Sequence, residues 1–138
     1  DEFASQTVAQ RVMPGARIAI EKHRRAGDRL VLMSASVDLY VPKLGALLGF
    51  DAVICTQVQW FGEVLDGRLA GENCRGEEKS RQLAGLRERH PGASIVAYGN
   101  SLSDVPHLLL SERGVFINAP PRARLMLERQ GLTCESWR

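Results

Sequence analysis

The sequence is poor in cysteine, in aromatic residues, in net charge and in long apolar runs. Each of these shortages argues against a class of function. Its three cysteines are spaced for neither a disulfide framework nor a zinc site. Aromatic residues make up 6% of the chain and the net charge is only +2, which gives no support for nucleic-acid binding. No apolar run is long enough to span a bilayer, and the first residues lack the pattern of a secretory signal. We therefore expect a cytoplasmic protein with reduced thiols and no membrane or nucleic-acid partner.

Lysine is also scarce, with 3 lysines against 15 arginines. A lysine kept within such an arginine bias suggests a need for a compact ammonium group rather than a planar guanidinium. The three histidines show no i, i+4 pair, so the sequence gives no histidine metal site.

What the sequence does contain is an alternation of short apolar runs with segments of helical spacing. Nearly continuous apolar runs of four or five residues are typical of strands buried on both faces of a parallel sheet. An Asp-Gly pair at 66–67 interrupts the alternation and predicts a small antiparallel excursion over residues 57–70. The expected fold is α/β, a doubly wound parallel sheet in one domain. The expected strands are 29–33, 52–55, 94–98 and 114–118, with a possible edge strand in 132–137, and the expected helices are 14–27, 37–48, 76–89, 103–110 and 121–130.

Three polar sites follow the expected strands or open an expected helix. They are Ser34 after the first strand, Lys79 in the first turn of the 76–89 helix, and Asn100 to Asp104 after the third strand. Ligands of such sheets bind beyond the carboxyl ends of the strands. A hydroxyl, an ammonium group and an oxygen-rich turn at one edge predict a site for a phosphoryl group and a magnesium ion.

Each site also has an ordinary structural interpretation. Ser34 could cap the following helix, and Ser103 or Asp104 could cap the helix after the third strand. Glu77 or Glu78 could be the anionic neighbour that Lys79 needs in the first helical turn, which would make it an ordinary surface residue. The residues alone leave these alternatives open.

Taken in order, the three sites resemble motifs II, III and IV of the haloacid-dehalogenase-like hydrolases, in the phosphoserine-phosphatase-like branch. The resemblance covers nearly all of residues 14 to 134 and includes Gly71-Glu-Asn-Cys-Arg-Gly-Glu-Glu-Lys79 and Tyr98-Gly-Asn-Ser-Leu-Ser-Asp104. It implies a Rossmann-like core and a Mg²⁺-dependent phosphatase acting on a small phosphorylated metabolite. Ser34 and the backbone N–H of Ala35 would bind phosphate, Lys79 would neutralise it, and Asn100 and Asp104 would hold Mg²⁺ directly or through its waters.

Two features depart from this family pattern. Asn100 stands where many relatives carry Asp, and the nucleophile motif D-x-D-x-[TS] is absent, since no two aspartates are spaced i, i+2. The resemblance implies that the nucleophile, on the central strand, lies upstream of residue 1. It also implies that residues 1–13 return from a helical cap before a core domain of 14–138. The strands at 29–33 and 94–98 would then lack the strand between them.

We accordingly expect this chain to be inactive in isolation. It would be completed by a retained upstream fragment or work as an oligomer. The alternative from a different class is a non-catalytic phosphate-binding or regulatory domain that has lost the nucleophile.

Overall fold

The computed structural model describes residues 2, 7, 9–61 and 63–138, which form two compact units. The first unit lies within Asp1–Cys74 and the second is Arg75–Arg138. Helices alternate with strands in both units, and the two main sheets are parallel. The predicted α/β class is confirmed. The expected cap return over 1–13 falls largely outside the described residues, and that domain boundary stays a prediction.

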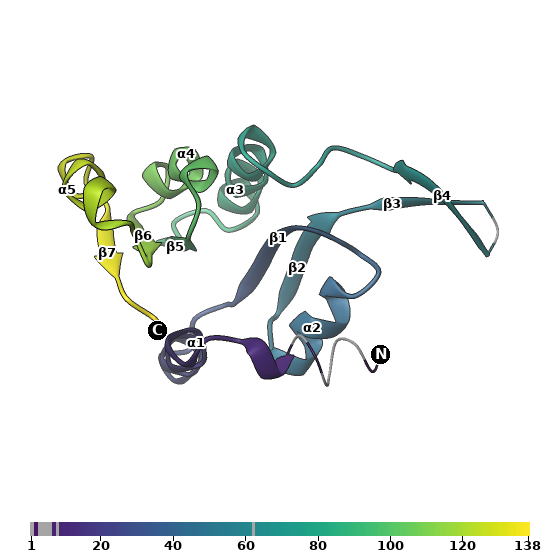
Figure 1. The fold of residues 1–138 in the computed structure, drawn as a ribbon, viewed down its shortest axis with the longest axis horizontal. Helices are drawn as coiled ribbons and strands as arrows, with labels where there is room; N and C mark the ends of the chain where they lie inside the picture. The colour runs from purple at the N-terminus through teal and green to yellow at the C-terminus, as the bar shows by residue number, and fades with distance from the viewer. Residues whose placement is uncertain (1, 3–6, 8, 62) are drawn as a thin grey trace. The chain divides into compact units, whose positions relative to one another are not determined.

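In the first unit, a two-stranded parallel sheet carries one helix against it and continues into a hairpin (Figure 1). Strand β1 pairs with β2, and α2 packs on both strands. The short strands are rich in Val, Leu and Ile, as expected of a sheet covered by helices. The elements are a 3₁₀ turn (Ala9–Arg11), α1 (Pro14–Arg25), β1 (Val31–Val37), α2 (Val41–Leu48), β2 (Ala52–Thr56), β3 (Val58–Phe61) and β4 (Val64–Leu69).

Strand β1 runs past its apolar stretch, which corrects two predicted boundaries. It includes Ser34, expected to follow the strand, and the helix expected from residue 37 begins at Val41. The pairing register shifts between Ser34 and Val37. Beyond the shift, the Asp38 N–H still donates to the Thr56 carbonyl at 2.9 Å, so the chain stays bonded to β2 instead of turning into a helix.

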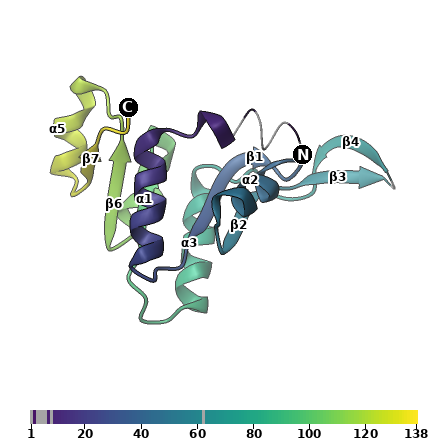
Figure 2. The same ribbon diagram turned by 90° about the horizontal axis from the view of Figure 1, so that it is seen from below.

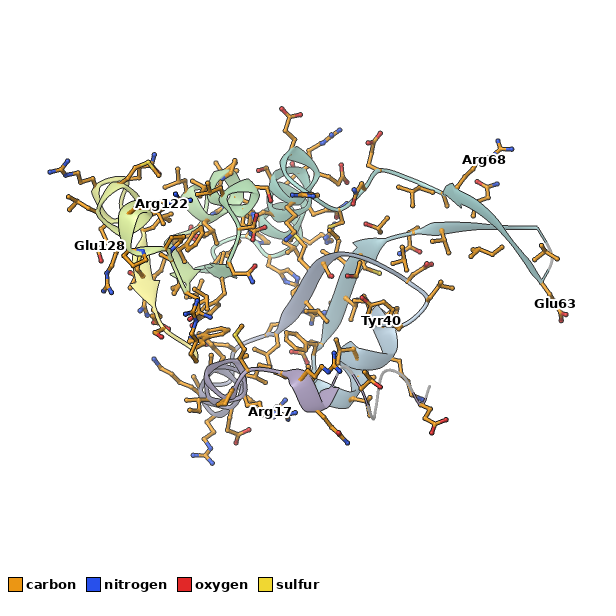
Figure 3. All side chains as sticks on the ribbon, in the orientation of Figure 1. Arg17, Tyr40, Glu63, Arg68, Arg122 and Glu128 are labelled. Atoms are coloured by element: carbon orange, nitrogen blue, oxygen red, sulfur yellow. The ribbon has the colours of Figure 1, made fainter. Side chains whose placement is uncertain are left out.

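The predicted antiparallel excursion is confirmed by β3 and β4. They pair antiparallel, with Val58 opposite Leu69 and Trp60 opposite Leu65. Figure 1 shows this hairpin extending from the end of β2, and in Figure 3 the side chains of Glu63 and Arg68 extend from it. The exposed side chains of Val64, Leu65 and Leu69 agree with a hairpin that stands away from the sheet of its unit.

The second unit has a three-stranded parallel sheet in the order β5-β6-β7. Its core is formed by Leu108, Phe116, Leu127 and Leu132. Helix α4 packs on β5 and β6, and α5 lies beside β7 (Figure 2). The predicted edge strand in the C-terminal tail is confirmed by β7, whereas the helix expected over 103–110 is divided into a 3₁₀ turn and a short α-helix. The elements are α3 (Glu77–Arg89), β5 (Val96–Gly99), a 3₁₀ turn (Leu102–Asp104), α4 (Val105–Leu109), β6 (Arg113–Ile117), α5 (Pro121–Arg129) and β7 (Thr133–Glu135).

Strands β1 and β5 each end a sheet. β1 pairs with β2 and β5 pairs with β6, and within the described residues neither strand has a second partner strand. The expectation of a further strand between them stays a prediction. All three cysteines are free thiols, and in the described part of the chain no helix is long and apolar enough to cross a membrane.

Gly114 lets β6 pass close under α4. A Cβ atom at this position would lie 2.5 Å from the Leu108 carbonyl oxygen and 2.6 Å from Leu132 Cδ2, and the carbonyl is backbone that cannot rotate away. We expect Gly114→Ala to lower the free energy of unfolding by about 1–3 kcal/mol, as for overpacking. Chemical denaturation monitored by circular dichroism would measure it.

Gly85→Ala is the matched control. In the middle of α3, at a partly exposed position, a Cβ atom would meet only the flexible guanidinium of Arg89 at 3.3 Å. This change should stabilise the protein by about 0.5–1 kcal/mol through helix propensity. Equal effects of the two substitutions would contradict the close approach at Gly114.

Candidate functional site

A buried ion pair joins α3 to the segment that follows β5. Lys79 Nζ lies 2.8 Å from Asp104 Oδ1, and the two side chains are only 14% and 6% exposed. Glu78 is instead bonded to Arg81 and Gln82 on its own helix. The interpretation of Lys79 as a surface residue paired with its neighbours in α3 is therefore wrong.

The second oxygen of the Asp104 carboxylate organises the turn after β5. Asp104 Oδ2 accepts the backbone N–H groups of Asn100 and Ser101, each at 3.2 Å. The Ser101 hydroxyl in turn accepts the Ser103 N–H at 3.3 Å, which completes a capping box on the 3₁₀ turn. The N-cap of this turn is Ser101, and Asp104 makes no side-chain capping bond to α4, so the expectation that Ser103 or Asp104 caps the following helix is wrong. Asp104 instead closes the capping box from its third position while it also bonds Lys79.

Gly99 is required at the end of β5 because the Asp104 side chain lies directly against it. A Cβ atom at Gly99 would be 2.7 Å from Asp104 Cβ and 2.9 Å from its Oδ2. Only a residue without a side chain allows the carboxylate to reach back to the turn. Asn100 follows directly and is exposed at the carboxyl end of β5, as predicted.

Charge at this site is fixed by the pair. Burial alone would raise the pKa of Asp104, but the hydrogen bond and charge of Lys79 and the two backbone N–H groups bring it below its usual value. His107, one turn further along, is buried, and its Nδ1 has no hydrogen-bond partner in the described structure. Burial lowers the pKa of His107, so its imidazole is neutral at pH 7.

These residues fit only part of a magnesium site. Three hydrogen bonds occupy the Asp104 carboxylate and Lys79 balances its charge, so Asp104 can reach a cation with at most one remaining lone pair or through water. The amide oxygen of Asn100 is a hard ligand of the kind that Mg²⁺ prefers, but it carries no charge. No group of three or more acidic, histidine or cysteine side chains placed for a metal occurs among the described residues. A complete site therefore needs further oxygens.

Ser34 and Ala35 belong to the first unit. The Ser36 N–H donates to Ser34 Oγ at 3.1 Å. This bond uses a lone pair of the hydroxyl and leaves its hydrogen for donation to another acceptor. The N-cap of α2 is Tyr40, without a side-chain capping bond, so the interpretation of Ser34 as a helix cap is wrong.

One buried residue beside Ala35 was not singled out from the sequence. The Thr56 side chain ends β2, is 2% exposed and contacts Ala35, Asn73 and Cys74. Its only sequence signal is a polar residue directly after an apolar run, the same signal that drew attention to Ser34.

A model of the haloacid dehalogenase-like hydrolases matches residues 1–109. The chain belongs to this family. It is similar to the phosphoserine phosphatase SerB1 of Mycobacterium tuberculosis (strain H37Rv), at 26% identity over all of this chain and 46% of SerB1. It is also 26% identical to the histidinol-phosphatase of Neisseria meningitidis serogroup C, over 92% of this chain and 59% of that protein.

The fold agrees with these relatives. A probable phosphoserine phosphatase from Vibrio cholerae superposes with a TM-score of 0.77 at 18% identity, covering 99% of this chain and 42% of that one. The expected family and fold are confirmed. The chain spans about half the length of the curated relatives it matches.

The buried pair predicts a specific response to neutralising Asp104. Asp104→Asn leaves the Lys79 ammonium buried without its counter-charge, so we expect a loss of about 3 kcal/mol in the free energy of unfolding at pH 7. The folded-state pKa of Asp104 is lowered, so its contribution is present above the unfolded pKa and is lost as the pH falls through the folded value. The variant should therefore lose less stability than the wild type on acidification.

Glu112→Gln is the matched control, since Glu112 pairs with Arg87 while more than a third of each side chain is exposed. Its pKa is lowered to about 2, chiefly by the Arg87 hydrogen bond, so its contribution is lost between about pH 4.5 and 2. At pH 7 the control should cost much less than Asp104→Asn, because solvent screens an exposed ion pair. Urea unfolding at several pH values compares the two, and equal losses at pH 7 would contradict the buried pair.

Proposed function

We propose that this chain is the core of a phosphatase that hydrolyses a small phosphomonoester through an aspartyl-phosphate. The observation that carries the proposal is the Lys79–Asp104 pair, which fixes a cation against the turn at the carboxyl end of β5. In the sheets of α/β proteins this edge is where ligands bind. Membership of a hydrolase family supplies the reaction class.

Lys79 is proposed to neutralise the phosphoryl oxygens and the attacking carboxylate. Its partner Asp104 holds the ammonium in one position before substrate arrives, so little reorganisation is needed during the reaction. The Ser34 hydroxyl, already oriented by the Ser36 N–H, would donate its hydrogen to a phosphate oxygen. The backbone N–H of Ala35 would be a second donor to the same group.

The attacking carboxylate is proposed to come from a segment outside these 138 residues. None of the six aspartates belongs to a D-x-D pair. A strand carrying that motif could pair with the edge of β1 or with that of β5, each of which ends its sheet among the described residues. The first aspartate would attack phosphorus, and the second would act as general acid and base.

Asn100 is proposed to hold Mg²⁺, with Asp104 acting on the ion through water. When bound, the ion would offset charge on the phosphoryl oxygens. The carboxylates of the missing segment and the substrate itself would supply the oxygens that the described residues lack.

The substrate is proposed to be a small phosphorylated metabolite. The similar proteins are named for phosphoserine and for histidinol phosphate, and each compound is a phosphomonoester on a small amine-bearing carbon skeleton. Both carry the phosphate group that Ser34 and Lys79 are each proposed to bind. The residues described here recognise the phosphate and carry no group assigned to the rest of the substrate.

Removing the Lys79 charge tests the proposal. In the full-length gene product, Lys79→Ala should lower turnover of a phosphomonoester on the order of 10²- to 10³-fold, as for loss of one electrostatic stabiliser. Steady-state release of inorganic phosphate measures it. Lys43→Ala, on the exposed face of α2, is the matched control and should retain turnover. Near-normal turnover in a folded Lys79→Ala protein would remove Lys79 from the mechanism.

The alternative is a binding or regulatory domain without a nucleophile, which the absence of D-x-D in this sequence favours. Magnesium-dependent binding of inorganic phosphate by the full-length protein, with no turnover of any phosphomonoester, would establish the alternative. Phosphate release that depends on an upstream aspartate would exclude it.

The neutral ligand at position 100 predicts weak metal binding that a charge can improve. Asn100→Asp adds a carboxylate, and we expect Mg²⁺ affinity to rise by about 10-fold because affinity follows ligand charge. Isothermal titration with MgCl₂ measures it. Gln130→Glu, exposed just after α5, adds the same charge elsewhere and should leave the affinity unchanged. An equal gain in both variants would show a general charge effect and would contradict ligation by residue 100.

A further inference from the structure

A single buried hydroxyl in the first unit connects three segments of the chain. Thr56 Oγ1 lies 2.7 Å from the Ala35 carbonyl oxygen, 3.1 Å from Asn73 Oδ1 and 3.0 Å from the Cys74 backbone nitrogen. Thr56 and Cys74 are both 2% exposed, so the hydroxyl and the Cys74 N–H that bonds it are shielded from water. The hydroxyl thus links the end of β1, the end of β2 and the segment that leads towards α3.

The hydrogen count assigns each bond a direction. A hydroxyl has one hydrogen to donate. The Ala35 carbonyl oxygen is the nearest acceptor, so the Thr56 hydroxyl donates its hydrogen to it. The Cys74 N–H donates to Thr56 Oγ1. The remaining contact, with the Asn73 side chain, is a hydrogen bond if the Asn73 NH₂ group donates to Thr56 Oγ1. The surrounding hydrogen bonds determine which end of an amide faces its partner, and here they favour the NH₂ group. In this arrangement the Thr56 hydroxyl donates one hydrogen bond and accepts two.

The bond to Ala35 controls the position of Ser34. The Ala35 carbonyl and the Ser36 N–H belong to one planar peptide unit, so fixing the carbonyl also fixes the direction of the N–H. That N–H donates to Ser34 Oγ at 3.1 Å. Thr56 therefore acts on the Ser34 hydroxyl through one rigid peptide, although it does not contact that hydroxyl. The pairing register of β1 with β2 shifts between Ser34 and Val37. Regular strand pairing therefore does not fix the backbone of this turn, and the Thr56 bond adds a constraint there.

We propose that Thr56 is a positioning residue that holds the Ser34–Ser36 turn in the conformation that binds phosphate. The inference rests on the proposed function, because the turn needs a phosphate ligand for its position to matter. Through Cys74, the same hydroxyl would also anchor the segment that leads into α3, whose Lys79 is five residues further along the chain.

The test uses the full-length protein and a matched set of variants. Thr56→Val removes the hydroxyl at nearly constant volume, and Thr56→Ser restores it. Val53→Ala, three residues earlier on β2 and outside the hydrogen bonds of the junction, is the control for a general loss of stability. We expect kcat/KM for a phosphomonoester to fall about 10- to 100-fold in Thr56→Val, as for a small displacement of a binding group. It should remain within a few-fold of wild type in the other two variants.

A double-mutant cycle separates positioning from a purely structural role. If Thr56 acts through the Ser34 hydroxyl, Thr56→Val should cause little further loss of kcat/KM once Ser34→Ala has removed that hydroxyl. Independent, multiplying losses would overturn the inference, as would equal losses in Thr56→Val and Val53→Ala. If Thr56→Val does not fold, Asn73→Ala removes one contact of the junction and should give a smaller, equally non-additive loss.

Amide hydrogen exchange keeps this test separate from that of the function. Absence of turnover in the wild type would count against the proposed phosphatase. Independently of turnover, the Ser36 and Cys74 amides should exchange faster in Thr56→Val than in Thr56→Ser or Val53→Ala. Unchanged exchange at Ser36 in Thr56→Val would overturn the inference even in an active enzyme.

Discussion

The buried pair of Lys79 and Asp104 is the constraint on which the second unit's polar site depends. One oxygen of the Asp104 carboxylate accepts a hydrogen bond from the Lys79 ammonium on α3. The other oxygen accepts two backbone N–H groups of the turn after β5. Because both tasks fall to the same side chain, the cation and the turn cannot move independently. Gly99 is the steric counterpart of this arrangement, since a side chain there would displace the carboxylate.

The first unit builds its polar site with hydroxyls and no buried charge. Ser34 and Thr56 end the regular pairing of adjacent parallel strands, and a peptide carbonyl connects them. Neutral hydrogen bonds of this kind are individually weaker than those to charged groups, but they need no counter-charge when buried. The chain thus uses two different physical means to hold polar groups at strand ends, one electrostatic and one based on peptide geometry.

Local patterns in the sequence were enough to predict most elements, because buried parallel strands and amphipathic helices have distinct periods. They also drew attention to Lys79 and to the turn at Asn100. They did not identify the partner of Lys79, since Asp104 is 25 residues away and local spacing favoured Glu77 or Glu78. The end of β1 was misplaced because pairing with Thr56 prolongs the strand past the polar residues Ser34 and Ser36, which local spacing does not reveal. A single threonine at the end of a strand, such as Thr56, belongs to no recognisable sequence pattern. Its hydrogen bonds could therefore be identified only from the structure.

The open sides of β1 and β5 also bear on how the polypeptide behaves in a crowded solution. An edge strand presents a row of backbone donors and acceptors to any extended chain, and charges or prolines that would discourage such contacts are absent from Val31–Val37 and Val96–Gly99. The backbone itself does not distinguish a strand of the same protein from a strand of another molecule. For each of the two sheets, a segment that covers the edge strand would therefore also protect the protein from self-association.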